Sequence, residues 1–125
     1  MKSISKIQIK KCYPYNLYKL KHKLDLSNQQ ISDISFLRDL LILNDLNLET
    51  NFISDISPLS KLFSLKIIIL FENQITDISP LKNLIGLEFL DLVCNDDIPE
   101  EQIIELNKAL PYCAIYANNI NLETY

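Results

Sequence analysis

Glycine and histidine are nearly absent from this 125-residue chain, and tryptophan is absent altogether. The one glycine, Gly86, cannot build a glycine-rich phosphate loop, which needs several. One histidine, His22, and three cysteines, Cys12, Cys94 and Cys113, form neither a cluster with metal-ligand spacing nor a recognisable nucleophile and base. The sequence therefore predicts no catalytic residue, no metal and no cofactor, and we expect a protein that is not an enzyme.

Long apolar runs are also missing. No run could cross a membrane, and Met1 to Lys23 lack the apolar stretch of roughly 7 to 15 residues that a signal peptide needs. The three cysteines are an odd set without disulfide-framework spacing. We expect a cytoplasmic protein with no membrane partner, while specialised export into another cell stays open. Cys94 and Cys113 could approach one another, but we favour them as small apolar core residues.

Acidic residues are lacking from residues 1–24, which carry seven lysines, whereas residues 25–125 carry sixteen acids and five bases. The net charge of −4 hides this polarity. Two alternatives follow from the basic end. It could bind nucleic acid or another acidic partner, which we disfavour because the domain as a whole is not basic. It could also meet the acidic body of a second copy in a self-assembling structural protein, although we expect a monomer or weak self-association.

What the sequence does contain is a repeat. Asn51, Asn73 and Asn95 lie 22 residues apart, each three places after the second residue of an apolar-x-apolar pair. Leu or Ile fills further columns at the same spacing: Leu24, Leu46, Ile68, Leu90; Leu26, Leu48, Leu70, Leu92; Ile31, Ile53, Ile75; Ile34, Ile56, Ile78; Leu37, Leu59, Leu81; Leu40, Leu62, Leu84; and Leu43, Leu65, Leu87. A fixed period of this length, with this leucine and asparagine frame, indicates a stacked repeat architecture.

A single 22-residue unit cannot enclose a core, but stacked units bury one continuous aliphatic column. Each apolar-x-apolar segment predicts a short strand, and parallel stacking with a return path predicts a right-handed solenoid of the α/β class. We expect a parallel sheet on its concave face and a 3₁₀ or irregular convex side. The asparagine amides can donate and accept, so the Asn51, Asn73 and Asn95 column is expected to bond to the backbone of successive turns.

The return path repeats a second polar pattern. Asp33, Asp55 and Asp77 recur in register, which predicts a backbone-bonding role in every unit and argues against catalytic carboxylates or calcium ligands. Ser57 and Ser79, each followed by proline, are expected to cap short helical turns.

The segments LNLETNFISDISPLSKLFSL and IILFENQITDISPLKNLIGL resemble the 22-residue class of leucine-rich repeats, known from internalins and from phosphatase-regulator-like repeat proteins. The resemblance covers residues 24 to about 95 and implies a binding protein. Gln29 departs from the asparagine column, as expected near an end. The run from Pro99 to Leu110 reads as an amphipathic helix, and with the following Leu-Pro-x-Cys-x-Ile segment it resembles the terminal units of bacterial leucine-rich repeat proteins.

We therefore divide one domain, residues 1–125, into an amino-terminal cap at 1–23, repeats at 24–95, and a carboxy-terminal cap and tail at 96–125. For the amino-terminal cap, a degenerate coil is the first choice and a small independent cap the alternative. A last strand is expected near Tyr112 to Tyr116, with Cys113 and Ile115 pointing inward.

Side chains alternate along a strand, so the residues that flank each inward pair are expected to face solvent on the concave side. There the early strands are polar and the late ones apolar. The predicted partner-binding residues are Ile67, Ile69, Phe71, Phe89, Val93 and Tyr116, with Asp45, Glu49 and Asp91 beside them. We expect a protein partner, of unknown identity, with an apolar anchor and a basic rim.

Overall fold

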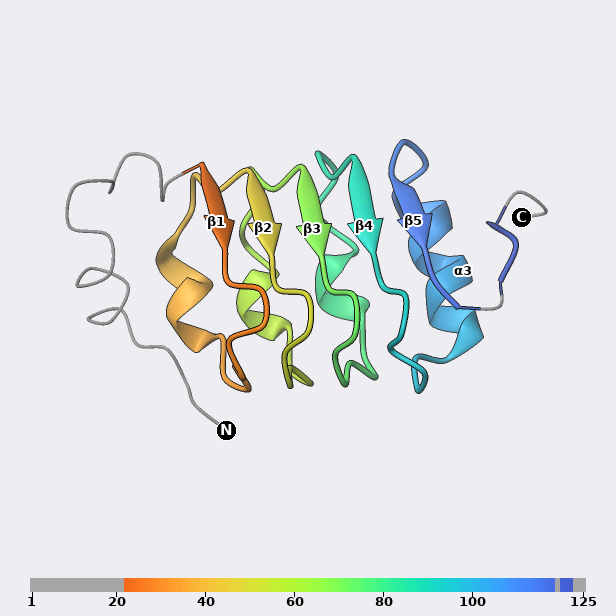
Figure 1. Cartoon of the computed structure of the whole chain (residues 1–125). Helices are drawn as coiled ribbons and strands as arrows, with labels where there is room; N and C mark the ends of the chain where they lie inside the picture. Colours follow the sequence, from red (N-terminus) through yellow and green to blue (C-terminus); the bar gives the residue numbers. More distant parts are fainter. Residues whose placement is uncertain (1–21, 119, 123–125) are drawn as a thin grey trace.

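The computed structural model describes residues 22–118 and 120–122. In this part of the chain, five three-residue strands form one parallel sheet in the order β1-β2-β3-β4-β5 (Figure 1). Their bounds are Lys23–Asp25, Asp45–Asn47, Ile67–Ile69, Phe89–Asp91 and Ala114–Tyr116. Every expectation that rests on residues 1–21, including both versions of the amino-terminal cap and its basic surface, lies outside the described residues.

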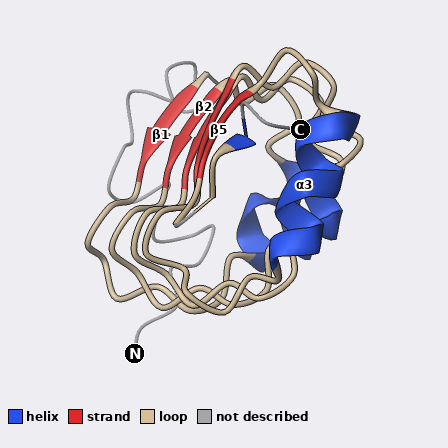
Figure 2. Ribbon diagram, turned by 90° about the vertical axis from the view of Figure 1, so that its right-hand side faces the viewer, coloured by secondary structure: helices blue, strands red, loops and turns tan. Residues whose placement is uncertain are grey.

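Each of the strands β1 to β4 is followed by a return path on the opposite side of the coil (Figure 2). Three of the return paths contain 3₁₀ turns, η1 (Ser35–Asp39), η2 (Ser57–Leu59) and η3 (Ser79–Leu81), and the fourth contains the helix α3 (Glu100–Ala109). The predicted α/β solenoid, with its parallel sheet and 3₁₀ return side, is therefore confirmed.

The core is the stack of apolar columns that the repeat predicts. The central residues of the strands pair in the register Leu24, Leu46, Ile68, Leu90 and Ile115. All but the half-buried Ile115 are buried, as are the columns on the return side except for the half-buried Leu40. Apolar surface removed from water contributes about 25 cal/mol per Å², so each turn is stabilised mainly by contact with the turns on either side.

The asparagine column forms a ladder that joins the turns. Asn73 Nδ2 donates to the carbonyl oxygens of Leu48 at 2.9 Å and of Leu70 at 3.1 Å, and Asn73 Oδ1 accepts from the N–H of Ile53 at 3.0 Å. Asn51 and Asn95 repeat this pattern one turn away in each direction. Each amide therefore bonds to two consecutive turns, as predicted, and no buried side-chain nitrogen or oxygen in the described residues lacks a partner.

Gln29, which stands in the asparagine column of the first unit, does not extend the ladder. Its Nε2 donates to the Ser27 carbonyl at 3.1 Å, and its backbone N–H donates to Asn51 Oδ1 at 3.1 Å. The longer side chain bonds within its own turn, so the ladder begins at Asn51.

Just before each asparagine the chain takes a left-handed conformation. Asn28, Thr50, Glu72 and Cys94 have φ values of 55°, 56°, 56° and 63°. This region is unfavourable for residues with a Cβ, and glycine would be the usual choice. The strain is offset by hydrogen bonds between turns: the N–H groups of the first three residues donate to carbonyls of the following turn at 2.8 to 2.9 Å. Cys94, which lies in the last full repeat, donates instead to Asn118 Oδ1 at 3.1 Å.

The aspartate column on the return side bonds to the backbone, as predicted. Asp33, Asp55 and Asp77 each accept, through Oδ1, the N–H of the serine two residues later at 2.9 Å. The expectation that Ser57 and Ser79 cap the turns is wrong. They are the first residues inside η2 and η3, the cap positions are Ile56 and Ile78, and neither cap makes a side-chain bond. The side chain that bonds to the backbone at the start of each turn is the aspartate two residues before the serine, because its carboxylate accepts the serine N–H.

The helix α3 covers the last turn. Its Ile103 and Leu106 are buried, as is Leu110 just beyond its end. Gln102 Oε1 accepts the N–H of Ile78 at 2.9 Å, which fixes α3 against the preceding return path. The expected helix from Pro99 is thus present, with Pro99 as its cap residue.

Replacing Asn73 by alanine is predicted to destabilise the fold strongly. The change leaves the Ile53 N–H without its acceptor, and a buried polar group left unsatisfied costs about 1 to 3 kcal/mol. It also removes one of the two asparagine donors to each of the Leu48 and Leu70 carbonyls, at about 0.5 to 1.5 kcal/mol per bond. We expect the free energy of unfolding in urea to fall by about 3 kcal/mol or more. Asn83→Ala, at an exposed asparagine of the same repeat, is the matched control and is expected to change it little. Equal effects of the two changes would contradict the ladder's role.

Asp77 is predicted to titrate below its ordinary pKa of 3.8, because the backbone N–H of Ser79 and then the Ser79 hydroxyl stabilise its carboxylate. A lowered folded pKa means that the stabilisation is present above the unfolded pKa and is lost as pH falls through the folded one. Carboxyl-carbon NMR should show this low midpoint. Ser79→Ala should raise it only in part, since the backbone N–H remains. The equivalent change Ser35→Ala should leave the Asp77 midpoint unchanged.

Candidate functional site

The solvent-facing side of the sheet, here called the sheet face, changes character along the solenoid. On β1 and β2 its residues are Lys23, Asp25, Asp45 and Asn47. On β3 they are Ile67 and Ile69, and the register pairs Ile67 with Phe89 of β4 and Ile69 with Asp91. Adjacent strands lie about 4.8 Å apart, so side chains in one column touch.

The apolar residues of this face form one cluster, here called the apolar patch. It comprises Ile67, Ile69, Phe71, Phe89, Val93 and Tyr116. The rings of Phe89 and Tyr116 lie 5.3 Å apart at an interplanar angle of 37°. Tyr116 is 53% exposed, and the other five side chains are half-buried. The structure thus brings the predicted apolar residues together on one face, with the aromatic pair held in a fixed tilted contact.

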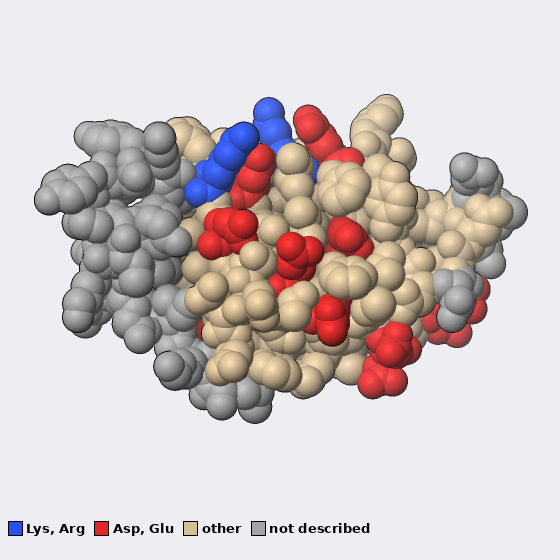
Figure 3. Space-filling model, viewed as in Figure 1, with Lys and Arg blue, Asp and Glu red and all other residues tan. Residues whose placement is uncertain are grey.

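Two of the predicted acidic residues, Asp45 and Glu49, lie on the β2 side of the patch, and the third, Asp91, lies within it, between Ile69 and Tyr116 in register. All three side chains make polar contacts. Asp91 Oδ1 accepts the N–H of Val93 at 3.0 Å, and Asp45 Oδ2 lies 3.6 Å from Lys23 Nζ. Glu49 Oε1 accepts a bond from Asn47 Nδ2 at 3.5 Å. Figure 3 shows Asp and Glu spread across this face, with Lys and Arg at its upper edge. The rim of the patch is therefore acidic.

One break in the repeat on this face escaped sequence reasoning. Asp25, Asn47 and Asp91 occupy the same column and each accepts, through Oδ1, the N–H two residues later, at 2.9, 3.0 and 3.0 Å. These bonds close a turn at the end of the strand. Ile69 is the residue of that column in β3 and has no oxygen to offer. The signal was present in the sequence, because the column holds Asp, Asn, Ile and Asp in β1 to β4, followed by Tyr116 in the terminal strand β5.

Two cavities in the described part of the chain lie away from the apolar patch. One of about 330 Å³ adjoins the last turn and is lined by Asn95, Ile103 and Ile120 among others. Another of about 330 Å³ runs along the asparagine edge and includes Thr50 and Phe52. The described part of the tail, where Ile120 and Leu122 pack on the core at the end of the solenoid, extends away from β3 and β4 (Figure 1). Neither these two cavities nor the described part of the tail includes a patch residue, so within the described residues the patch suits a macromolecule better than a small ligand.

Residues 22–118 and 120–122 hold no group of three or more potential metal-ligating side chains. His22 is exposed, and its Nδ1 lies 3.0 Å from Asn44 Oδ1. No helix in that part of the chain is long and apolar enough to cross a membrane.

The two described cysteines differ in environment. Cys113 is buried and Cys94 is exposed, and both are free thiols. Burial raises the pKa of Cys113 to about 11, because it disfavours the charged thiolate. Cys113 therefore acts as an apolar core residue, as favoured, whereas Cys94 does not.

A scan against protein-family models gave no match, and a search of curated proteins gave none either. Solved structures gave clear matches. Internalin C2 of Listeria monocytogenes is 28% identical, with a TM-score of 0.68 over 88% of this chain and 52% of its own. A leucine-rich repeat protein of Leptospira interrogans is 25% identical, with a TM-score of 0.66 over 75% of this chain and 24% of its own.

The leucine-rich repeat domain of APL1B, 12% identical, shares the fold alone, with a TM-score of 0.63 over 94% of this chain and 44% of its own. The chain spans about half or less of the length of all three structures.

The cysteine environments give a direct test. In a Cys12→Ser chain at pH 8, we expect one thiol per native molecule to react rapidly with Ellman's reagent and two after denaturation, since Cys94 is accessible and Cys113 is protonated and buried. Adding Cys94→Ser should abolish the rapid reaction. Two fast thiols in the native protein would contradict the burial of Cys113.

Proposed function

Because the chain is a leucine-rich repeat protein, we propose that it is a non-catalytic protein-interaction module whose partner binds on the sheet face at the apolar patch. The similar structures favour an interaction protein in general. The position of the site is our inference from the chemistry of the face.

The observation that carries this proposal is the break at Ile69. Three strands use an Asp or Asn in that column to close the turn that follows, and β3 gives up the bond for an exposed apolar surface. The core gains nothing from the exchange, because the inward column is already complete. An apolar residue that displaces a stabilising one on a solvent-facing surface is expected where a partner covers it.

The patch also has the composition of a binding hot spot. Phe71, Phe89 and Tyr116 are the proposed anchors, since aromatic side chains dominate the energy of protein interfaces. The Phe71 carbonyl accepts the Thr50 N–H at 2.8 Å, so its backbone is fixed before binding. Preorganised anchors lose little entropy when a partner docks.

The rim defines the chemistry of the partner. Asp45 and Glu49 lie on the β2 side of the patch, and Asp91 lies within it, between Ile69 and Tyr116 in the sheet register. Lys23 Nζ lies 3.6 Å from Asp45 Oδ2. A partner with an apolar or aromatic anchor and lysine or arginine around it complements this arrangement. Such rim pairs set orientation and the rate of association more than affinity.

The test compares partner capture by wild type and by the double variant Phe71→Ala, Phe89→Ala, using affinity purification from the native source with mass spectrometry. We expect a specific partner to be lost by about tenfold or more, because each removed anchor is expected to cost at least about 1 to 2 kcal/mol of binding. Phe52→Ala, an exposed phenylalanine at the asparagine edge, is the matched control and should retain the partner.

Both phenylalanines are half-buried, so thermal unfolding must show that the double variant is folded. Tyr116→Ser, at a side chain that is 53% exposed, provides a second variant with little effect on the core. Undiminished capture by Tyr116→Ser and by a folded double variant would overturn the assignment of the partner site to the patch.

A further inference from the structure

Four tight turns line the edge of the solenoid at which the strands begin. They span residues 40–43, 62–65, 84–87 and 110–113, and each is closed by a hydrogen bond from its fourth N–H to its first carbonyl, at 3.1, 3.0, 3.0 and 3.1 Å. Leu43, Leu65, Leu87 and Cys113 at the ends of these turns are buried. Every turn is thus pinned to the core on one side and points its tip outward.

At least one of the two central residues of each turn is a large apolar or aromatic side chain, beside Ser64, Gly86 or Pro111 in the last three turns. Leu41 is 58% exposed, Phe63 60%, Ile85 82% and Tyr112 92%. We call these four residues the turn-tip row. Turn centres are normally Gly, Pro, Asn, Asp or Ser, because those residues favour the backbone and tolerate water. Neither the turn nor the core requires an exposed Leu, Phe or Ile at three successive repeats.

The turns that carry the row are stacked on one another by backbone bonds. Three N–H groups donate to the backbone carbonyl oxygen of the preceding turn: Lys66 to Asn44 at 2.7 Å, Glu88 to Lys66 at 2.8 Å, and Ala114 to Glu88 at 2.9 Å. These bonds lie immediately before successive strands, at the upper edge of the sheet in Figure 1. The tips therefore follow one another at the repeat spacing along one side of the molecule.

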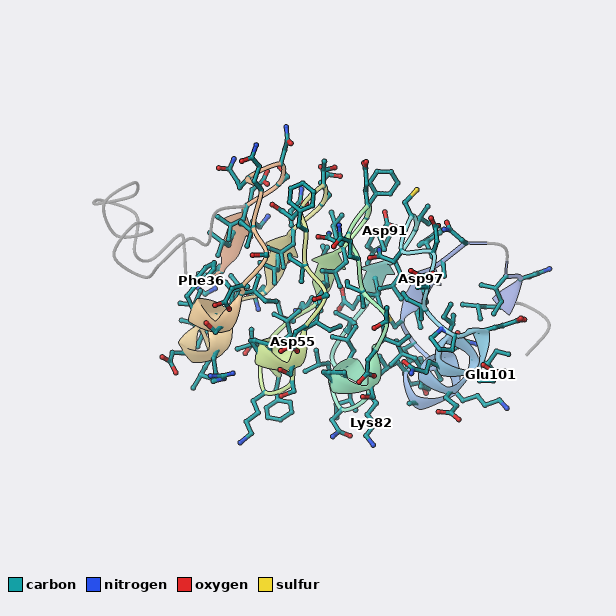
Figure 4. All side chains as sticks on the ribbon, turned by 90° about the horizontal axis from the view of Figure 1, so that it is seen from below. Phe36, Asp55, Lys82, Asp91, Asp97 and Glu101 are labelled. Carbon is teal, nitrogen blue, oxygen red and sulfur yellow. The ribbon has the colours of Figure 1, made fainter. Side chains whose placement is uncertain are left out.

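Positive charge gathers beside the same turns. Within residues 38–44, 60–66, 82–88 and 108–112 there are five bases, Arg38, Lys61, Lys66, Lys82 and Lys108, and two acids, Asp39 and Glu88. The remaining described residues contain one lysine, Lys23, against thirteen acids. All five bases are exposed, and Lys82 points away from the sheet, on the side of the 3₁₀ turns (Figure 4).

We propose that the turn-tip row and its basic neighbours bind the surface of an anionic lipid bilayer. Protruding apolar tips enter the boundary between headgroups and acyl chains, while lysine and arginine bind acidic headgroups. A bilayer suits the four exposed, projecting side chains better than a protein does, because a protein would have to supply complementary pockets for them and a bilayer does not. The molecule would lie on the membrane without crossing it.

This site is separate from the apolar patch, because the two surfaces have no residue in common. The expectation of no membrane partner rested on the lack of a spanning segment. That lack does not bear on contact with a membrane surface.

Co-sedimentation of the full chain with vesicles tests the proposal. We expect binding to phosphatidylcholine–phosphatidylserine vesicles at low salt and little binding to phosphatidylcholine alone. Phe63→Ser with Ile85→Ser, and separately Lys61→Glu with Lys82→Glu, should each weaken binding by about tenfold or more. All four side chains are exposed, so these variants should fold. Phe52→Ser and the Phe71→Ala, Phe89→Ala patch variant are controls that should bind like wild type.

The absence of tryptophan gives a second readout. A tryptophan placed by Phe63→Trp should shift its emission to shorter wavelength when anionic vesicles are added, whereas one placed by Phe52→Trp should not. No co-sedimentation of the wild type, or undiminished binding by the Phe63→Ser, Ile85→Ser variant, would overturn the proposal. The second outcome would assign binding to charge elsewhere, such as the seven lysines within residues 1–24.

Discussion

The bonds from the asparagine amides to the backbone of two consecutive turns are the constraint on which the rest of the structure depends. Each strand is only three residues long, too short to fix its own register by pairing alone. Asn73 links the turn that ends at Leu48 to its own turn at Leu70, and the neighbouring asparagines repeat the link. A one-residue slip would leave a buried amide and three backbone groups unpaired, so the ladder excludes it.

The left-handed residues before the asparagines follow from the same constraint. An asparagine that reaches two carbonyls must enter the interior directly after the strand, and the chain can turn that sharply only with positive φ. Thr50 and Glu72 accept this conformation, although the chain contains almost no glycine, because their N–H groups bond to the next turn. The strain is therefore tied to stacking and is relieved only in the assembled solenoid.

With the register fixed, alternation along the strand and the geometry of the turns decide what each surface exposes. The sheet face displays the residues between the buried columns, and the strand-start edge displays the turn tips. Nothing in the core restricts these positions, so they are free to vary between repeats. Variation is what the sheet face shows, from Asp45 in β2 to Ile67 in β3, whereas the turn tips keep one chemistry from Leu41 to Ile85.

Much of the fold could be predicted from sequence, because periodicity reports burial directly. This includes the buried apolar columns, the strand positions, the asparagine and aspartate bonds, and the terminal helix. Details that depend on local geometry could not. Ser57 was expected to be a cap because Ser-Pro is a common helix start, yet the Asp55 carboxylate lies closer to the N–H that needs a partner. The exposure of Phe63 was also missed, since an apolar residue beside Leu62 and Leu65 reads as core until the turn is known.

The apolar patch residues share one face of the sheet, and their use by a partner stays a prediction. Periodicity identifies a solvent-facing column. It does not say which departures from a column are functional. Ile69 becomes informative only once Asp25, Asn47 and Asp91 are seen to make the same turn-closing bond. The structure supplies the reason why an isoleucine there is a loss to stability.

Charge relates the two proposed surfaces to each other. Five of the bases flank the turn tips, while most acids lie on the sheet face, on the return side and on α3. An anionic surface attracts the first and repels the second, with interactions that fade over a Debye length of about 8 Å in physiological salt. A solenoid held by its turn tips would therefore stand on that edge, because tilting toward the sheet would bring Asp45 and Asp91 toward the lipid. The apolar patch would then stay open to a basic partner in solution.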